Sequence, residues 1–359
     1  MTYQNEKKNK RKQKLHSLIH HPYFGFIIIV FLMFFVQLIR LLGVEVSVSI
    51  LRAFGSTMIF TIVALGFSIL LGYGGLASLG TAGFVGLGAY TLVYFTNIVP
   101  LPIFLTVLIV IVGAIILGTV VGFISLRIEG MYLAIITLGL SEILNEVFKR
   151  ATNITGGTTG VNIDGIILFK NIVSVNHNVV FVIISIILFI IMILTLNIMK
   201  SPTGRALLAM RNSSSAAQAM GVSIFKYRLL AFIVTTVYAM LAGVLYMTYW
   251  SFTIPSTWTL AFSLNILVAV VVGGSQSIYG IILGTFMIFG LDLAVFKQID
   301  FFVANPGITI VMNGILIIVV VMFYPGGLIK LVNALGIKLK KIFMNWIKKW
   351  KEFKYGIDS

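Results

Sequence analysis

Long runs of apolar residues recur along nearly the whole chain and restrict its fold more than any other feature. The first extends from Tyr23 to Gly43, about the 20 residues that an α-helix needs to cross a membrane. Apolar residues make up 59% of the 359 residues and charged residues only 10%, too few to cover a water-soluble globule. The runs are continuous rather than alternating, unlike the strands of a membrane β-barrel. The sequence therefore predicts an all-α integral membrane protein and excludes a soluble enzyme.

Breaks rich in glycine, polar or charged residues divide this apolar sequence into about ten spans. An even number places both ends of the chain on one side of the membrane. Five spans precede a long loop at 150–177 and five follow it, so two inverted five-helix halves are compatible with the pattern. Glycines near the ends of the third and eighth spans argue against straight helices there. The expected spans are 23–43, 50–71, 76–98, 101–125, 130–148, 178–199, 229–250, 262–279, 281–296 and 308–324.

The distribution of basic residues provides an independent test of this topology. If the chain starts in the cytoplasm, 20 of its 26 lysines and arginines lie in cytoplasmic segments, as the positive-inside rule requires. We expect basic cytoplasmic tails over 1–22 and 330–359, and a transmembrane region over 23–329 with a cytoplasmic loop at 200–228. The second tail has apolar residues at helical spacing, typical of an amphipathic helix on anionic lipid. The net charge of +16 then reflects topology and lipid contact, and no nucleic-acid partner is expected.

The 200–228 loop has the pattern of two short helices. Pro202 suits an early helical position, Ser213 can cap the second helix, and Gly221 suits a left-handed turn that ends it. A small, flat face on the second helix could enter a groove of another protein, although an ordinary basic loop would satisfy the charge rule equally well. The residues of this face are Ala216, Ala217 and Met220.

The segment 72–90 is unusually rich in glycine and small polar residues. Its glycines permit close approach to a neighbouring helix, while Ser78 and Thr81 can form hydrogen bonds across the contact. A broken helix in this segment, which includes Gly75, would expose free backbone amides, and its positive amino end suits a carboxylate. Close helix packing without any ligand is the alternative. The glycines proposed for close approach are Gly80, Gly83 and Gly86, and a second packing face is expected at Gly118 and Gly122.

Ionisable residues inside a membrane are costly, which draws attention to the fifth span. Glu142, Glu146 and Arg150 follow one another at intervals of four residues and share one helical face. One interpretation is an ion pair between Glu146 and Arg150 at the outer interface, with Glu142 extending toward water. In the other, Glu142 lines a pathway and meets a substrate ammonium. No chemistry is assigned to the lone carboxylates Asp164, Asp292 and Asp300.

Several chemistries have no sequence signature in this chain. There is no cysteine, no His-Glu-x-x-His pattern and no helical spacing of histidines that would bind a metal. No Gly-x-x-x-x-Gly-Lys-Ser/Thr phosphate loop occurs. We therefore expect no catalytic residue, metal or bound cofactor, and any ATP hydrolysis must take place on another polypeptide.

Four motifs, taken in order, resemble the LivM-type permeases of bacterial branched-chain amino acid ABC importers. The resemblance extends from about residue 50 to 330. The motifs are the glycine-rich segment 72–90, Thr155-Gly156-Gly157-x-x-Gly160, the sequence Gly204-Arg205-Ala-x-x-Ala-x-Arg211 with Ala216-Ala217-x-x-x-Gly221, and Phe323-Tyr-Pro-Gly-Gly-Leu328.

This resemblance implies the fold of an ABC importer permease in the bacterial cytoplasmic membrane, with both termini cytoplasmic. It also implies a second, LivH-like permease subunit, two ABC ATPase subunits that use ATP, and an extracytoplasmic substrate-binding protein. Coupling to the ATPases is then expected at Gly204, Arg205, Arg211, Ala216, Ala217 and Gly221. The substrate-pathway candidates are Gly75, Ser78, Thr81, Glu142, Thr155, Gly156 and Gly157.

The implied activity is uptake of branched-chain or other apolar amino acids, and two alternatives stay open. The chain departs from the family where acidic residues usually precede the alanine pair, since Asn212 and serines stand there, and where Leu76 and Thr81 replace side chains common in the family. A related permease for urea or short amides is therefore one alternative. An ion-coupled secondary transporter is the other, although only Glu142 could serve as its coupling group.

Overall fold

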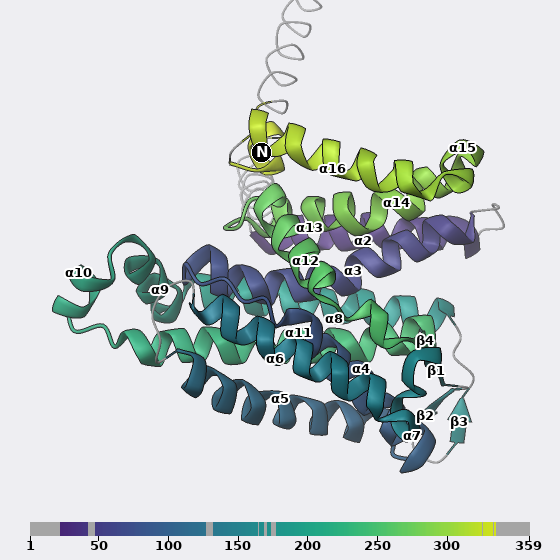
Figure 1. Cartoon of the computed structure of the whole chain (residues 1–359). Coiled ribbons are helices and arrows are strands. Elements are labelled where there is room, and N and C mark those ends of the chain that lie inside the picture. The colour runs from purple at the N-terminus through teal and green to yellow at the C-terminus, as the bar shows by residue number, and fades with distance from the viewer. Residues whose placement is uncertain are drawn as a thin grey trace, which may run out of the picture.

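A computed structural model describes residues 22–41, 47–126, 132–163, 165–168, 171–173, 177–324, 326–332 and 334. Of the expected N-terminal tail, only Pro22 is among these residues. Asp164 and most of the expected C-terminal tail also lie outside them. The described chain folds into a bundle of roughly parallel and antiparallel helices (Figure 1).

Helices occupy each of the expected spans, because apolar runs of this length satisfy their backbone polar groups only within a helix in lipid. Six of the described helical segments are long and apolar enough to cross a membrane, and shorter apolar helices lie at 25–37 and 314–323. The principal helices are α2 (Pro22–Leu41), α3 (Val48–Ser68), α4 (Thr81–Val93), α5 (Ile103–Ser125), α6 (Tyr132–Arg150), α8 (His177–Lys200), α11 (Ile224–Trp250), α12 (Leu260–Gly273), α13 (Ile278–Thr285) and α16 (Pro306–Phe323).

Three expected spans are interrupted. The third begins as an irregular segment, so α4 starts only at Thr81 and ends in a π-helical turn, η2 (Tyr94–Ile98). The boundary between the eighth and ninth spans lies at 274–277 rather than near 280, because the Ser277 hydroxyl caps α13. The ninth span then contains a second π-helical turn, η5 (Phe286–Gly290), and continues as α14 (Leu291–Ala294).

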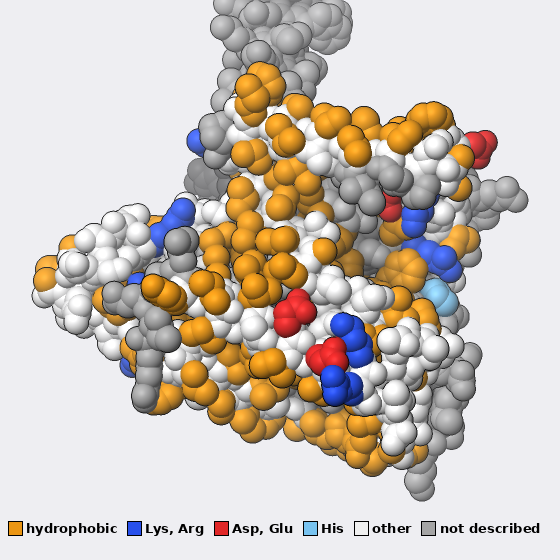
Figure 2. Space-filling view, in the orientation of Figure 1, with side chains coloured by type: hydrophobic (Ala, Val, Ile, Leu, Met, Phe, Trp, Pro, Cys, Tyr) orange, Lys and Arg blue, Asp and Glu red, His pale blue; other side chains and the backbone are white. Residues whose placement is uncertain are grey.

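Helix α3 is the centre of the bundle and is buried along most of its length. It continues into the π-helical turn η1 (Ile69–Tyr73) and packs against α8, α11, α12 and α13. The outer helices bury only one face. On α5, Val110, Ala114 and Gly118 are buried, while apolar side chains such as Leu108 and Ile116 are exposed. Exposed apolar side chains cover much of the flank in Figure 2, as expected for a surface in contact with lipid.

The two long loops lie at opposite ends of the bundle (Figure 1). Short helices α9 (Pro202–Asn212) and α10 (Ser214–Ala219) form one end, which we call the loop end. The opposite end, which we call the strand end, contains α7 (Thr152–Thr155), the antiparallel pair β1 (Val161–Asn162) and β4 (Phe252–Thr253), and the hairpin of β2 (Ile166–Leu168) and β3 (Asn171–Val173). This separation agrees with the expected placement of 200–228 and 150–177 on opposite sides of a membrane.

Candidate functional site

The glycine-rich segment contains the predicted break in a helix. The chain leaves η1 at Tyr73, runs without helical structure through 74–80, and enters α4 inside the bundle. Ser78 and Thr81 are both buried at this entry, and the Thr81 hydroxyl has no hydrogen-bond partner among the described residues. The break is therefore confirmed, and it places the first turn of α4 in the protein interior.

The amides at this break are not free, contrary to the expectation. Leu79 N donates to Thr137 Oγ1 at 3.0 Å, Ala82 N to Ser263 Oγ at 2.9 Å, and Gly83 N to Ser141 Oγ at 3.1 Å. The three acceptors are buried hydroxyls on α6 and α12. Side chains distant in sequence thus pair one amide just before α4 and two in its first turn, and a carboxylate at those amides would have to displace these side chains.

The close approach expected of Gly80, Gly83 and Gly86 is confirmed, and α6 is the main partner. A β-carbon on Gly80 would lie 2.9 Å from the Thr137 carbonyl oxygen, and one on Gly83 would lie 2.8 Å from Leu144. The packing face at Gly118 and Gly122 is confirmed too, with α11 as the partner: added β-carbons there would meet Ile233 and Leu229. In this structure the glycines serve helix packing.

The local predictions for the 200–228 loop are confirmed. Pro202 opens α9, and Gly221 has φ of 82° after α10. Ser213 accepts a hydrogen bond from the Ala216 amide at 3.3 Å and so caps α10. The expected flat face is only partly exposed, because Ala217 packs into the bundle with 5% of its surface accessible. Ala216 and Met220, the latter 85% exposed, remain available to another protein.

Arg211 links this loop to the broken helix. Its guanidinium donates to the carbonyl oxygen of Gly72, which also accepts from Gln276 Nε2 at 3.2 Å. Gly75 lies directly against the Arg211 side chain, where an added β-carbon would be 3.1 Å from Cγ. The structure thus brings together an expected coupling residue and an expected pathway residue. Of the other coupling candidates, Arg205 is exposed and donates to the Lys200 carbonyl oxygen at 3.0 Å.

Gly204 and the Thr155–Gly157 motif have packing roles in this structure. A β-carbon on Gly204 would lie 2.2 Å from the Met199 carbonyl oxygen, so α9 packs closely on the end of α8. Thr155 is buried, and its hydroxyl accepts from the Gly157 amide at 3.1 Å. Gly156 has φ of 68°, which a glycine adopts readily. These residues form the turn that follows α6 at the strand end.

On α6, the structure agrees in part with the interpretation in which Glu146 and Arg150 form an ion pair. Glu146 Oε1 and Arg150 Nε form the expected ion pair, 2.8 Å apart, and Lys149 approaches Glu146 at 3.8 Å. Glu142 is exposed on the outside of the described chain. Asn145 lies on the buried face of α6 and donates to the backbone carbonyls of Pro255 and Trp258 at 2.7 and 3.0 Å.

A cavity of about 740 Å³ near the strand end was not anticipated from the sequence. Its walls come from α3, α11, α12 and the segment from η5 through α14 to α15 (Asp300–Ala304). Six of the thirteen residues that line it are aromatic. The centroid of the Phe60 ring lies 4.5 Å from that of Phe289 and 5.2 Å from that of Phe262. The Tyr246 and Trp250 rings are stacked with their centroids 6.2 Å apart.

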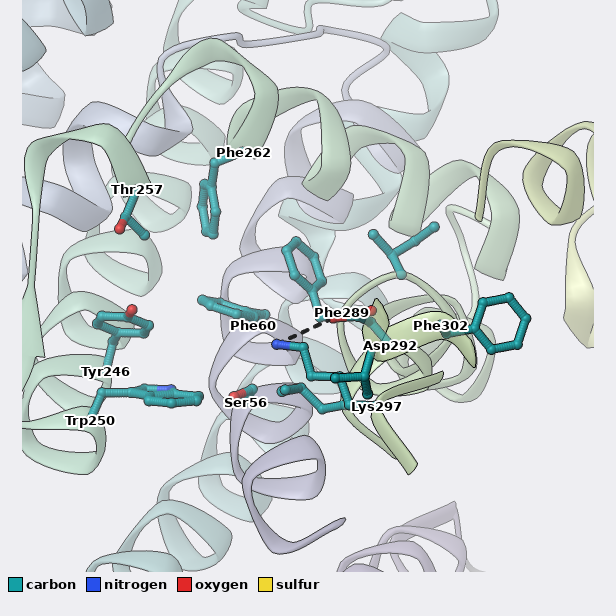
Figure 3. Close-up of a pocket in the computed structure, with 13 residues that line it drawn as sticks. Ser56, Phe60, Tyr246, Trp250, Thr257, Phe262, Phe289, Asp292, Lys297 and Phe302 are labelled. Carbon is teal, nitrogen blue, oxygen red and sulfur yellow. Dashed lines mark ion pairs between the residues drawn. The ribbon is translucent and has the colours of Figure 1, made fainter. Parts of the chain in front are cut away.

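Polar groups enter this aromatic cavity at a few points (Figure 3). Asp292 of α14 and Lys297 of the turn η6 (Phe296–Gln298) form a long ion pair, with 3.8 Å between Oδ2 and Nζ. Ser56 Oγ and Trp250 Nε1 are buried without a hydrogen-bond partner among the described residues. The two charges at the end of the ninth span were visible in the sequence, but nothing there indicated that Ser56 or Trp250 would face them.

Comparisons with known proteins agree with the membrane-helix architecture. The family model described as "Branched-chain amino acid transport system / permease component" matches residues 49–321. The high-affinity branched-chain amino acid transport system permease protein LivM of Escherichia coli (strain K12) is 30% identical over 255 residues, and that of Salmonella typhimurium is also 30% identical over 255 residues. Each of these alignments covers 65% of this chain and 60% of the relative. A probable LivM protein of Methanocaldococcus jannaschii is 26% identical over 237 residues, covering 61% of this chain and 68% of the relative.

The alignments therefore span less than two thirds of the length of the two bacterial relatives. No solved structure matches the chain significantly. The family match extends from the start of α3 to the end of α16 and includes both the loop end and the strand end. Because it covers well over half of the sequence, the chain belongs to the family of permease components of branched-chain amino acid transport systems.

Proposed function

We propose that this chain is the membrane-spanning subunit of an ATP-driven importer that moves branched-chain or other apolar amino acids across the bacterial cytoplasmic membrane. The observation that carries the proposal is the family match across 49–321, a range that extends from α3 to α16 and includes both long loops. Separate ATPase subunits hydrolyse ATP, and this chain supplies the path through the membrane. An ATP-driven importer of this kind requires both activities.

The loop end is the proposed docking site of an ATPase subunit. Ala216 and the exposed Met220 form a small apolar surface there. The Arg211–Gly72 hydrogen bond joins this loop to η1, the turn directly before the irregular segment 74–80. Movement of the loop would therefore pull on the irregular segment 74–80, whose backbone bonds back into η1 only through the amides of Gly74, Gly75 and Leu76.

Two further partners follow from this proposal. Glu142 is an exposed carboxylate on a helix expected to lie in the membrane, and a charge facing lipid is costly. A second, LivH-like permease subunit that covers this face of α6 would remove that cost. A substrate-binding protein would deliver the amino acid at the strand end, which is the outer side in the expected topology.

Uptake of labelled leucine and labelled urea, in cells that lack the gene and in cells that carry it on a plasmid, tests the proposal. We expect leucine uptake to depend on the gene and urea uptake to be unaffected. Dependence of urea uptake alone would support the amide permease instead. A tagged chain should also co-purify with an ATPase in mild detergent, and leucine uptake that persists without any associated ATPase would favour an ion-coupled transporter.

A further inference from the structure

We propose that the aromatic cavity near the strand end binds the zwitterionic head group of an α-amino acid. Asp292 pairs with the ammonium, Lys297 pairs with the carboxylate, and the apolar side chain lies against the aromatic wall. The inference rests on the proposed function and adds to it a defined binding site for the substrate.

The charge arrangement fits a zwitterion. Asp292 and Lys297 are the only charged residues among the described residues that line the cavity. Their 3.8 Å separation is longer than a well-formed charge-assisted hydrogen bond, and their side chains are 33% and 56% exposed. An α-amino acid presents one charge of each sign on a single carbon, so it can satisfy both partners without leaving a net charge. Urea, with no charge, would leave the pair unchanged.

Unpaired hydrogen-bonding groups beside the pair point to a ligand with strong acceptors. Ser56 is only 2% exposed, and neither its hydroxyl nor the Trp250 indole N–H has a partner among the described residues. Buried polar groups in proteins are normally paired. A carboxylate has two oxygens and about four acceptor positions, enough to bond Lys297, Ser56 and Trp250 together.

The rest of the cavity fits the apolar part of the substrate. Figure 3 shows Lys297 extending from the η6 side toward the rings of Phe60, Tyr246 and Trp250. A volume of about 740 Å³ is within the usual range for small-molecule sites, about 300–1,000 Å³, and accommodates an amino acid with water. The π-helical turn η5 ends two residues before Asp292, and such turns are frequent at functional sites.

Equilibrium binding to the complete transporter, purified with its partner subunits but without the substrate-binding protein, tests the assignment. The probes are labelled leucine, 4-methylpentanoate, which lacks the ammonium, and leucinamide, which lacks the carboxylate. We expect Asp292→Asn to weaken leucine binding about ten-fold or more and to leave 4-methylpentanoate unchanged. Lys297→Gln should weaken leucine by a similar factor and leave leucinamide unchanged.

This crossed pattern separates ligand contact from misfolding, because a misfolded variant would lose all three probes. Asp300→Asn, an exposed acid on α15 outside the cavity, is the matched control and should bind like the unmodified protein. Two results would refute the cavity as the site while cells still import leucine through the unmodified transporter. In one, the cavity variants bind all probes normally; in the other, the unmodified complex binds no leucine. In both cases the proposed function stands. If the unmodified transporter imports no leucine, the proposed function fails and the inference with it.

Discussion

Replacing Gly88 or Gly243 with alanine should force α4 and α11 apart. The two glycines lie at one helix crossing: a β-carbon on Gly88 would be 2.0 Å from the Met240 carbonyl oxygen, and one on Gly243 would be 2.0 Å from the Val85 carbonyl oxygen. Ordinary contact begins near 3.4 Å, so each methyl group requires a separation of about 1.4 Å. The atoms met are backbone, and no side-chain rotation can relieve the clash.

The expected cost of either substitution follows from this geometry. Overpacking a close-packed interior costs about 1–3 kcal/mol, and the upper part of that range applies where backbone meets backbone. The intrinsic preference of alanine for a helix returns up to about 1 kcal/mol. The net loss of stability is therefore about 2 kcal/mol. The double variant should lose less than twice that, because once the first methyl group has separated the helices the second one fits.

Thermal unfolding of the purified chain in detergent measures both effects. Gly113→Ala is the matched control, since it adds the same methyl group on α5 where no atom lies within 4 Å. We expect a lower unfolding midpoint for Gly88→Ala and Gly243→Ala, and an unchanged or higher one for Gly113→Ala. If all three variants behaved alike, or if the two losses simply added in the double variant, the close crossing of α4 and α11 would be refuted.

Three other substitutions test separate parts of the structure. Arg211→Ala should lower leucine uptake several-fold in proteoliposomes while ATP hydrolysis continues, because the loop loses its bond to Gly72 of η1, directly before the break. Asn145→Leu leaves two buried carbonyls without their donor, and a stability loss of about 1–3 kcal/mol should appear as a lower unfolding midpoint. Gly156→Ala puts a side chain at φ of 68° and should cost at least about 1–2 kcal/mol; normal stability would contradict the turn at the strand end.

The positions of the helices followed from the sequence because hydrophobicity and chain length decide them locally. A run of about 20 apolar residues must become helical in lipid, whatever its neighbours are. Caps and turns are equally local, and the roles of Pro202, Ser213 and Gly221 were therefore confirmed. The family resemblance, based on four short motifs, was confirmed by the match across 49–321.

The tertiary structure alone decided which groups meet. The amides at the break before α4 looked free in the sequence, yet hydroxyls far along the chain accept from three of them: Thr137 from Leu79, Ser263 from Ala82 and Ser141 from Gly83. Likewise, Ser56 and Trp250 join Asp292 and Lys297 at one cavity only because α3, α11 and α14 pack together. Helix periodicity indicates which residues share a face, but it does not indicate which other helix that face will contact. Contacts of this kind depend on packing between helices, and packing is a property of the whole fold.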